Sequence, residues 1–152
     1  MYNKQKGQTL IEALSALGII GLLLSATTVA VITALSNTTY NQNQTLATKY
    51  AQQGTEIVRQ IRDKNYTTFQ GYNGTYCLGN ATSFGGTCAT ANLFGTFVRK
   101  VQILPNGGCG VGNDSIIVTV TFRDTKCPAI NLYCHGETDT SCLSTVNPVQ
   151  AP

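Results

Sequence analysis

The chain has 152 residues, ten basic and seven acidic side chains, one histidine, and a formal net charge of +3. Two of its lysines lie in the first seven residues, which leaves eight basic and seven acidic residues elsewhere and no basic stripe typical of a nucleic-acid partner. The sequence has no GxSxG or HExxH motif and no pair of histidines, so we expect neither an enzyme nor a cofactor.

The residues from Ala13 to Leu35 form a stretch of 23 residues without an ionisable group. About 20 apolar residues are enough for a helix to cross the hydrocarbon layer. Lys4 and Lys6 precede the stretch and no basic residue follows it until Lys49, which favours a cytoplasmic N-terminus and an exported remainder. A cleaved secretory signal fits less well, because its apolar region is usually about 7–15 residues long and "SNTTYNQNQ" offers no A-x-A site.

A single carboxylate, Glu12, stands at the start of this stretch, in the string "KGQTLIEAL". One interpretation is a capping box, in which the Thr9 and Glu12 side chains bind free N–H groups at a helix start. The other uses the whole string, which resembles the N-terminal signal of type IV prepilins and pseudopilins. That resemblance implies a leader at residues 1–7, cleavage after Gly7, and a mature chain that begins at Gln8.

The resemblance also implies how the protein works. The mature N-terminal amine would be N-methylated and would pair with Glu12 of a neighbouring copy in a helical filament. The implied partners are a prepilin peptidase, an assembly platform with its ATPase, further copies of the chain, and the lipid bilayer before assembly. Many relatives begin with phenylalanine, whereas this chain has Gln8, which can cyclise to a neutral pyroglutamate unless methylation blocks that reaction.

The expected function is therefore a structural subunit of an extracellular, type IV pilus-like filament for adhesion, motility or DNA uptake. Before assembly it would be a single-pass protein of the cytoplasmic membrane with its head outside. Two alternatives remain open. One is a pseudopilin of a type II secretion or competence machine, and the other is a membrane-anchored ectodomain that does not polymerise.

The apolar stretch is predicted to be the first half of one helix over residues 8–65. Small residues that allow close helix approach recur in residues 8–35, at Ser15, Gly18, Gly21 and Ser25. In residues 36–65 the pattern becomes amphipathic, which predicts a surface for the head to pack on, with a coiled coil as the less favoured alternative. The apolar positions are Leu46, Ala47, Tyr50, Ala51, Gly54, Ile57, Val58 and Ile61, and on the opposite face Arg59 and Asp63 are spaced to pair.

Residues 66–152 are expected to form a small β-rich head, after loops that lead from the helix. "GTFVRKVQIL" and "SIIVTVTFRD" alternate as strands, and the turn-rich "PNGGCGVGND" between them predicts an antiparallel pair. A third strand is expected near Ala129–Tyr133. Together these elements predict an α+β fold in which the long helix packs on a small antiparallel sheet.

The six cysteines, all in the head, predict a disulfide framework and an oxidising compartment. They allow fifteen connectivities, of which a local Cys77–Cys88 bridge is favoured. The other pairings stay open among Cys109, Cys127, Cys134 and Cys142, two of which are expected to bracket the C-terminal segment. His135 follows Cys134 directly, but without a second histidine we expect no metal site.

Overall fold

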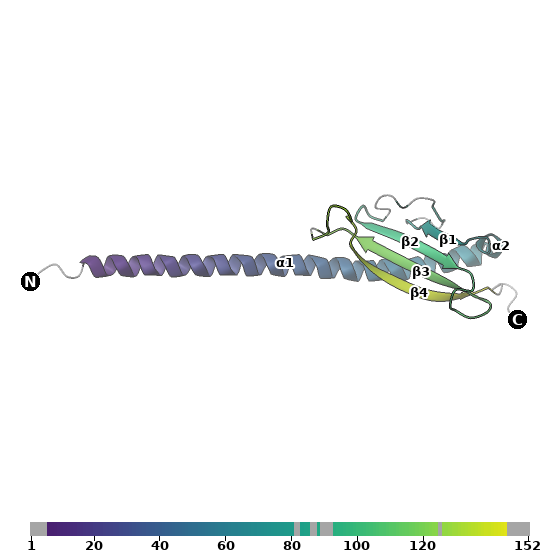
Figure 1. Cartoon of the computed structure of the whole chain (residues 1–152), viewed down its shortest axis with the longest axis horizontal. Helices are drawn as coiled ribbons and strands as arrows, with labels where there is room; N and C mark the ends of the chain where they lie inside the picture. Colours follow the sequence, from purple (N-terminus) through teal and green to yellow (C-terminus); the bar gives the residue numbers. More distant parts are fainter. Residues whose placement is uncertain (1–5, 81–82, 86–87, 89–92, 125, 146–152) are drawn as a thin grey trace, which may run out of the picture. The chain divides into compact units, whose positions relative to one another are not determined.

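The computed structural model of the chain describes residues 6–80, 83–85, 88, 93–124 and 126–145. It contains two helices and one antiparallel sheet in the order β1-β2-β3-β4 (Figure 1). The residues fall into two compact units, the N-terminal unit (residues 1–41) and the head unit (residues 42–152). The elements are α1 (Lys6–Lys64), α2 (Tyr66–Phe69), β1 (Gly74–Cys77), β2 (Phe97–Leu104), β3 (Asn113–Phe122) and β4 (His135–Ser144).

Helix α1 confirms the prediction of one long helix and begins slightly earlier than expected, at Lys6. Its sequence contains no proline, and its four glycines and polar residues do not interrupt the helix. Arg62 and Lys64 lie in its last turn, where positive charge is favourable next to the free carbonyl groups. The chain then turns at Asn65, whose side chain accepts a hydrogen bond from the Thr68 N–H and caps α2.

Strands β2 and β3 are paired as predicted, and their alternating side chains divide between two faces. Val101 lies opposite Val118, and Ile103 lies opposite Ile116. These residues are buried, whereas the intervening Thr119 of β3 is only half-buried. The β2–β3 connection contains four residues with positive φ, which its glycine-rich sequence supplies at little conformational cost: Asn106, Gly108, Gly110 and Gly112.

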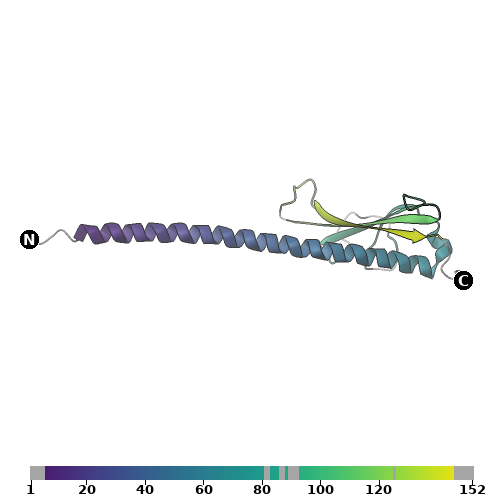
Figure 2. The same ribbon diagram turned by 90° about the horizontal axis from the view of Figure 1, so that it is seen from below.

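The head packs on the C-terminal part of α1 to form two layers, as Figure 2 shows from the edge of the sheet. The helix contributes small side chains here, and Ala47 and Val58 are fully buried. A Cβ atom added at Gly54 would lie 2.7 Å from Val118 Cγ1, so glycine is what lets this turn approach the sheet. Most of the predicted stripe is buried, but Leu46 is exposed, and Thr55, which was not predicted, is buried.

Three details of the sequence prediction are wrong. The third long strand is β4 at His135–Ser144, whereas residues 129–133 form no strand. The segment expected to be only loops contains α2 and β1, and β1 pairs with β2. On the exposed face of α1, Arg59 contacts Glu56 and Arg62 contacts Asp63, so the expected pair between residues 59 and 63 is replaced by two others.

Three disulfides join the six cysteines within the head unit. The pairs are Cys77–Cys88, Cys109–Cys142 and Cys127–Cys134. The second pair fastens the β2–β3 connection to β4, and the third closes a short loop before β4. In the chain-entropy model each closed loop of about 15 residues contributes about 3 kcal/mol, which matters for a head of this size.

Candidate assembly helix

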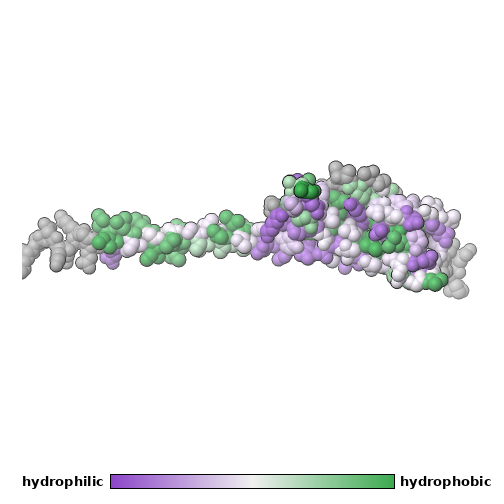
Figure 3. Space-filling model, viewed as in Figure 1, coloured by the Kyte–Doolittle hydropathy of each residue, from purple (hydrophilic) through white to green (hydrophobic). Residues whose placement is uncertain are grey.

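The first part of α1 presents an almost entirely apolar surface. Every residue from Leu10 to Leu35 is exposed in the isolated chain, including Leu22 at 73% and Ile11 at 70%. The apolar surface of this segment is visible in Figure 3. Among the described residues, α1 is the one helix long and apolar enough to cross a membrane. An uncovered apolar surface of this extent requires lipid or other protein around it.

The hydroxyl groups of this segment are satisfied within the helix itself. Ser15, Ser25, Thr27, Thr28 and Thr33 each donate to a backbone carbonyl three or four residues earlier. Such bonds remove the cost of placing a hydroxyl in an apolar medium. The segment therefore behaves as apolar despite its serines and threonines.

Glu12 is the one ionisable residue from Leu10 to Leu35. In the uncleaved chain α1 already includes Lys6, so Thr9 lies inside the helix rather than at its N-cap, and the structure does not favour the capping-box interpretation of Glu12. Gln8 precedes Glu12 by four residues, so one helical turn separates them. A carboxylate at the centre of a membrane-spanning helix costs about 2.5–3.5 kcal/mol unless it finds a partner, and Glu12, at the start of the apolar stretch, faces part of that cost.

The small residues predicted to allow close packing lie open on the helix. A Cβ atom added at Gly18 or Gly21 would meet nothing within 4 Å, and Ser15 and Ser25 are exposed. No contact within the described part of the chain therefore requires glycine at Gly18 or Gly21. This differs from Gly54, where the head itself requires the missing side chain.

The head is held on α1 by polar contacts that the sequence did not reveal. Thr55 Oγ1 donates to Asp139 Oδ2 at 2.6 Å, and Gln44 Nε2 donates to Glu137 Oε1 at 2.9 Å. Both acceptors come from β4, whose side chains alternate in burial although almost all are polar. The sequence pattern that could have predicted this strand is an alternation, with a period of two, among its polar residues (Thr, Ser, Glu and Asp).

Arg99 forms a second link between the sheet and α1. Its side chain is fully buried, and its guanidinium donates to the carbonyls of Tyr50, Leu78 and Gly79 and to the Gln53 side chain. Burial lowers the pKa of Arg99, with a smaller opposing effect from Tyr50. An arginine remains protonated in proteins, so this is a buried cation surrounded by carbonyl oxygens.

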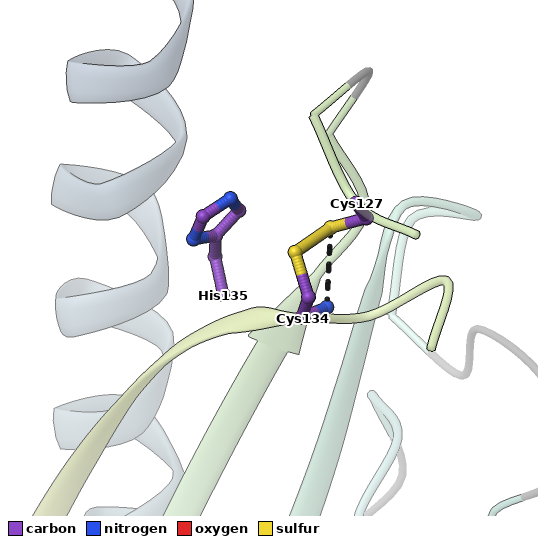
Figure 4. Close-up of side chains that lie close together, drawn as sticks. All are labelled: Cys127, Cys134 and His135. Carbon is purple, nitrogen blue, oxygen red and sulfur yellow. Dashed lines mark hydrogen bonds between the residues drawn. A yellow bond between two sulfur atoms is a disulfide. The ribbon is translucent and has the colours of Figure 1, made fainter. Parts of the chain in front are cut away.

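Cys127, Cys134 and His135 are the residues of the head that come closest to a metal-ligand set. Figure 4 shows the three side chains close together, and their ligand atoms lie within 4.8 Å of one another. The two sulfurs are bonded to each other, however, and metal binding by cysteine requires thiolates. The oxidised cluster therefore serves to close a loop.

Comparison with known families decides the class of the N-terminal segment. Residues 2–28 match the prokaryotic N-terminal methylation motif. The chain carries the type IV prepilin-like signature. This prepilin-like segment contains Gly7, Gln8 and Glu12, as well as the first open positions of α1. No curated protein and no solved structure matches the chain.

The signature and the fold together indicate the class of protein to which this chain is similar. The motif is typical of type IV pilin-like and pseudopilin precursors, and it favours a structural protein that is processed and self-assembles. The exposed apolar helix fits a membrane-anchored precursor. The motif ends at residue 28, so it carries no information on the head.

Proposed function

We propose that the chain is the structural subunit of a type IV pilus-like extracellular filament. A prepilin peptidase cuts after Gly7, and the apolar part of α1 then moves from the membrane into the core of the filament. An assembly platform and its ATPase drive this transfer. The observation that carries the proposal is the methylation motif on a helix whose surface from Leu10 to Leu35 is almost entirely apolar and is uncovered.

The proposal gives Glu12 a role in the register of the filament. Cleavage creates a cationic amine on Gln8, and the carboxylate of Glu12 pairs with that amine on a neighbouring copy. In an apolar bundle an unpaired charge is costly, so copies that pack out of register are disfavoured. The open positions at Gly18 and Gly21 let neighbouring helices approach closely.

The test replaces Glu12 and follows processing and assembly separately. We expect Glu12→Ala to be cut normally but to enter filaments at least about tenfold less often, since an unpaired buried charge costs several kcal/mol. Ser15→Ala, one turn away on the same helix, is the matched control and should assemble normally. Gly7→Ala should instead block cleavage. Normal filaments from Glu12→Ala cells would refute the role of Glu12 in assembly.

A pseudopilin of a secretion or competence machine remains the second candidate, because the same motif supports it. The two functions differ in the amount of polymer. Electron microscopy of appendages sheared from cells, with mass spectrometry of their subunits, should find this chain as a main component of long filaments if it is a pilin. Its presence only in trace amounts, or only in the membrane, would favour the pseudopilin. A mature protein that still begins at Met1 would favour an ectodomain that does not polymerise.

A further inference from the structure

The connection between β3 and β4 exposes large apolar side chains at its tip. Ile130 is 101% exposed and Leu132 is 44% exposed, so neither contributes much to the core of the head. Two cationic residues, Arg123 and Lys126, are also exposed in the same connection. This combination of aliphatic tip and basic flanks is typical of surfaces that enter a lipid headgroup region.

The tip is held in shape by bonds within the loop. The Cys127–Cys134 disulfide closes it, and the Cys134 N–H lies 3.2 Å from Cys127 Sγ. Inside the ring the Asn131 N–H donates to the Pro128 carbonyl at 2.9 Å, which makes a tight turn with Ile130 at its outer corner. A loop fixed in this way loses little conformational entropy when it binds.

The register of the sheet places this loop, hereafter the Cys127–Cys134 loop, at one defined end of the head. His135 pairs with Phe122, and Phe122 pairs with Phe97. Phe94, just before β2, therefore lies at the same end and is 65% exposed. The glycine-rich β2–β3 connection, with the fully exposed Val111, lies at the opposite end.

The end that carries the Cys127–Cys134 loop is also the end where α1 enters the head unit. Glu137, two residues into β4, accepts the hydrogen bond from Gln44. The apolar stretch ends at Leu35, only nine residues before Gln44. A membrane that holds the apolar stretch is thus tethered by a short chain to this end of the head, which raises the effective concentration of lipid at the loop.

We propose that the Cys127–Cys134 loop docks on the anionic headgroup surface of the membrane that anchors α1. Ile130 and Leu132 enter the interfacial layer, and Arg123 and Lys126 lie among the lipid phosphates. The inference rests on the membrane-anchored precursor of the proposed function and describes its state before assembly. The basic flanks and the short tether favour lipid over a second copy as the occupant.

The test uses the natural lack of tryptophan in the chain, which lets a single introduced tryptophan serve as a depth probe. The full precursor carrying Ile130→Trp is reconstituted into vesicles of phosphatidylcholine and phosphatidylglycerol, with lipids brominated near the headgroups as quenchers. The matched control is Val111→Trp, since both positions are fully exposed aliphatic residues in loops at opposite ends of the sheet. We expect quenching and blue-shifted emission for Ile130→Trp and neither effect for Val111→Trp.

The cationic flanks are tested in the Ile130→Trp background. Arg123→Gln and Lys126→Gln should each lower the ratio of docked to undocked loop about fivefold, which corresponds to about 1 kcal/mol per basic residue at an anionic surface. Lys100→Gln, on an exposed position of β2, should leave the ratio unchanged. High salt or vesicles of phosphatidylcholine alone should reproduce the loss.

Several outcomes would overturn the docking proposal while leaving the filament function intact. An Ile130→Trp probe that is not quenched, or one quenched no more than Val111→Trp, means that this end of the head does not dock. Emission that shifts with protein concentration but is not quenched by lipid means that a second copy covers the loop. A chain that fails to float with the vesicles contradicts the anchor itself, which the cleavage and filament assays check independently.

Discussion

At the scale of single residues, Glu12 and Arg99 are both charged side chains in apolar surroundings, and they differ in whether their own chain surrounds the charge with polar groups. Among the described residues Glu12 has no side-chain partner, since the hydroxyls of its segment bond to the backbone, and the proposed filament supplies one from a neighbouring copy. Arg99 is surrounded by oxygen atoms of its own chain, drawn from α1 and from the residues after β1. The first charge suits assembly between copies, and the second suits the internal architecture of the head.

The role of Arg99 can be measured by replacing it with an apolar side chain of similar length. Arg99→Met leaves the carbonyls of Leu78 and Gly79 without their donor, so we expect the free energy of unfolding to fall by about 2–3 kcal/mol. The measurement is thermal unfolding of the purified chain in detergent. Lys100→Met, on the exposed neighbouring position, should cost less than about 0.5 kcal/mol. Equal melting temperatures for the two variants would contradict the role of Arg99.

Gln8 provides a second test at this scale. The ion pair with Glu12 requires a positive charge on the mature N-terminus, and an N-terminal glutamine loses that charge if it cyclises. We therefore expect a methylated, uncyclised Gln8, because methylation blocks cyclisation. The intact mass of the N-terminal peptide from isolated filaments distinguishes the two forms. A pyroglutamate end would rule out the ion pair.

At the scale of elements, burial and chemistry explain which parts the sequence predicts. Helix α1 and strands β2 and β3 are apolar with clear periods, so their existence and the buried faces of the strands follow from the residue pattern. Strand β4 has the right period, but its inward positions include Glu137, Asp139 and Ser141, which reach polar groups of α1. Hydrophobic patterning cannot detect a strand that packs through hydrogen bonds, and it favoured the apolar tip at Ala129–Tyr133 instead.

Glycine has two roles in α1, because Gly54 packs against the sheet whereas Gly18 lies open, and this difference gives a prediction. Gly54→Ala places a Cβ atom 2.7 Å from Val118 Cγ1 and 3.0 Å from Arg99 Cδ. Overpacking of about 1–3 kcal/mol should exceed the gain of about 1 kcal/mol in helix propensity. We expect the head to melt about 4–8 °C lower for each kcal/mol lost. Gly18→Ala meets no atom and should leave the melting of the head unchanged, as circular dichroism in detergent would show. A head that melts normally in Gly54→Ala would mean that the helix shifts away at little cost.

At the scale of the whole molecule, the two units require different surroundings. The head unit has a buried core and three disulfides, as in a water-exposed domain, whereas the N-terminal unit exposes apolar side chains from Leu10 to Leu35. The sequence predicts some of the candidate functional residues and not others. The string "KGQTLIEAL" carries a specific motif that predicts roles for Gly7, Gln8 and Glu12, but loop residues such as Ile130 show their exposure only after the fold places them. The disulfide connectivity also needed the fold, because spacing alone leaves most of the fifteen pairings open.

The closed hydrogen bonds of the serines and threonines in α1 have a consequence for the route from bilayer to fibre. The hydroxyls between Leu10 and Leu35 already donate to carbonyls of their own helix, so these donors need no new partner when the helix changes neighbours. Moving the helix out of the lipid, or back into it, would then replace one set of apolar contacts with another of similar strength. Under the proposed function, and apart from the pairing of Glu12, this helix therefore changes its surroundings at little cost, and the assembly ATPase has mainly to give the transfer its direction.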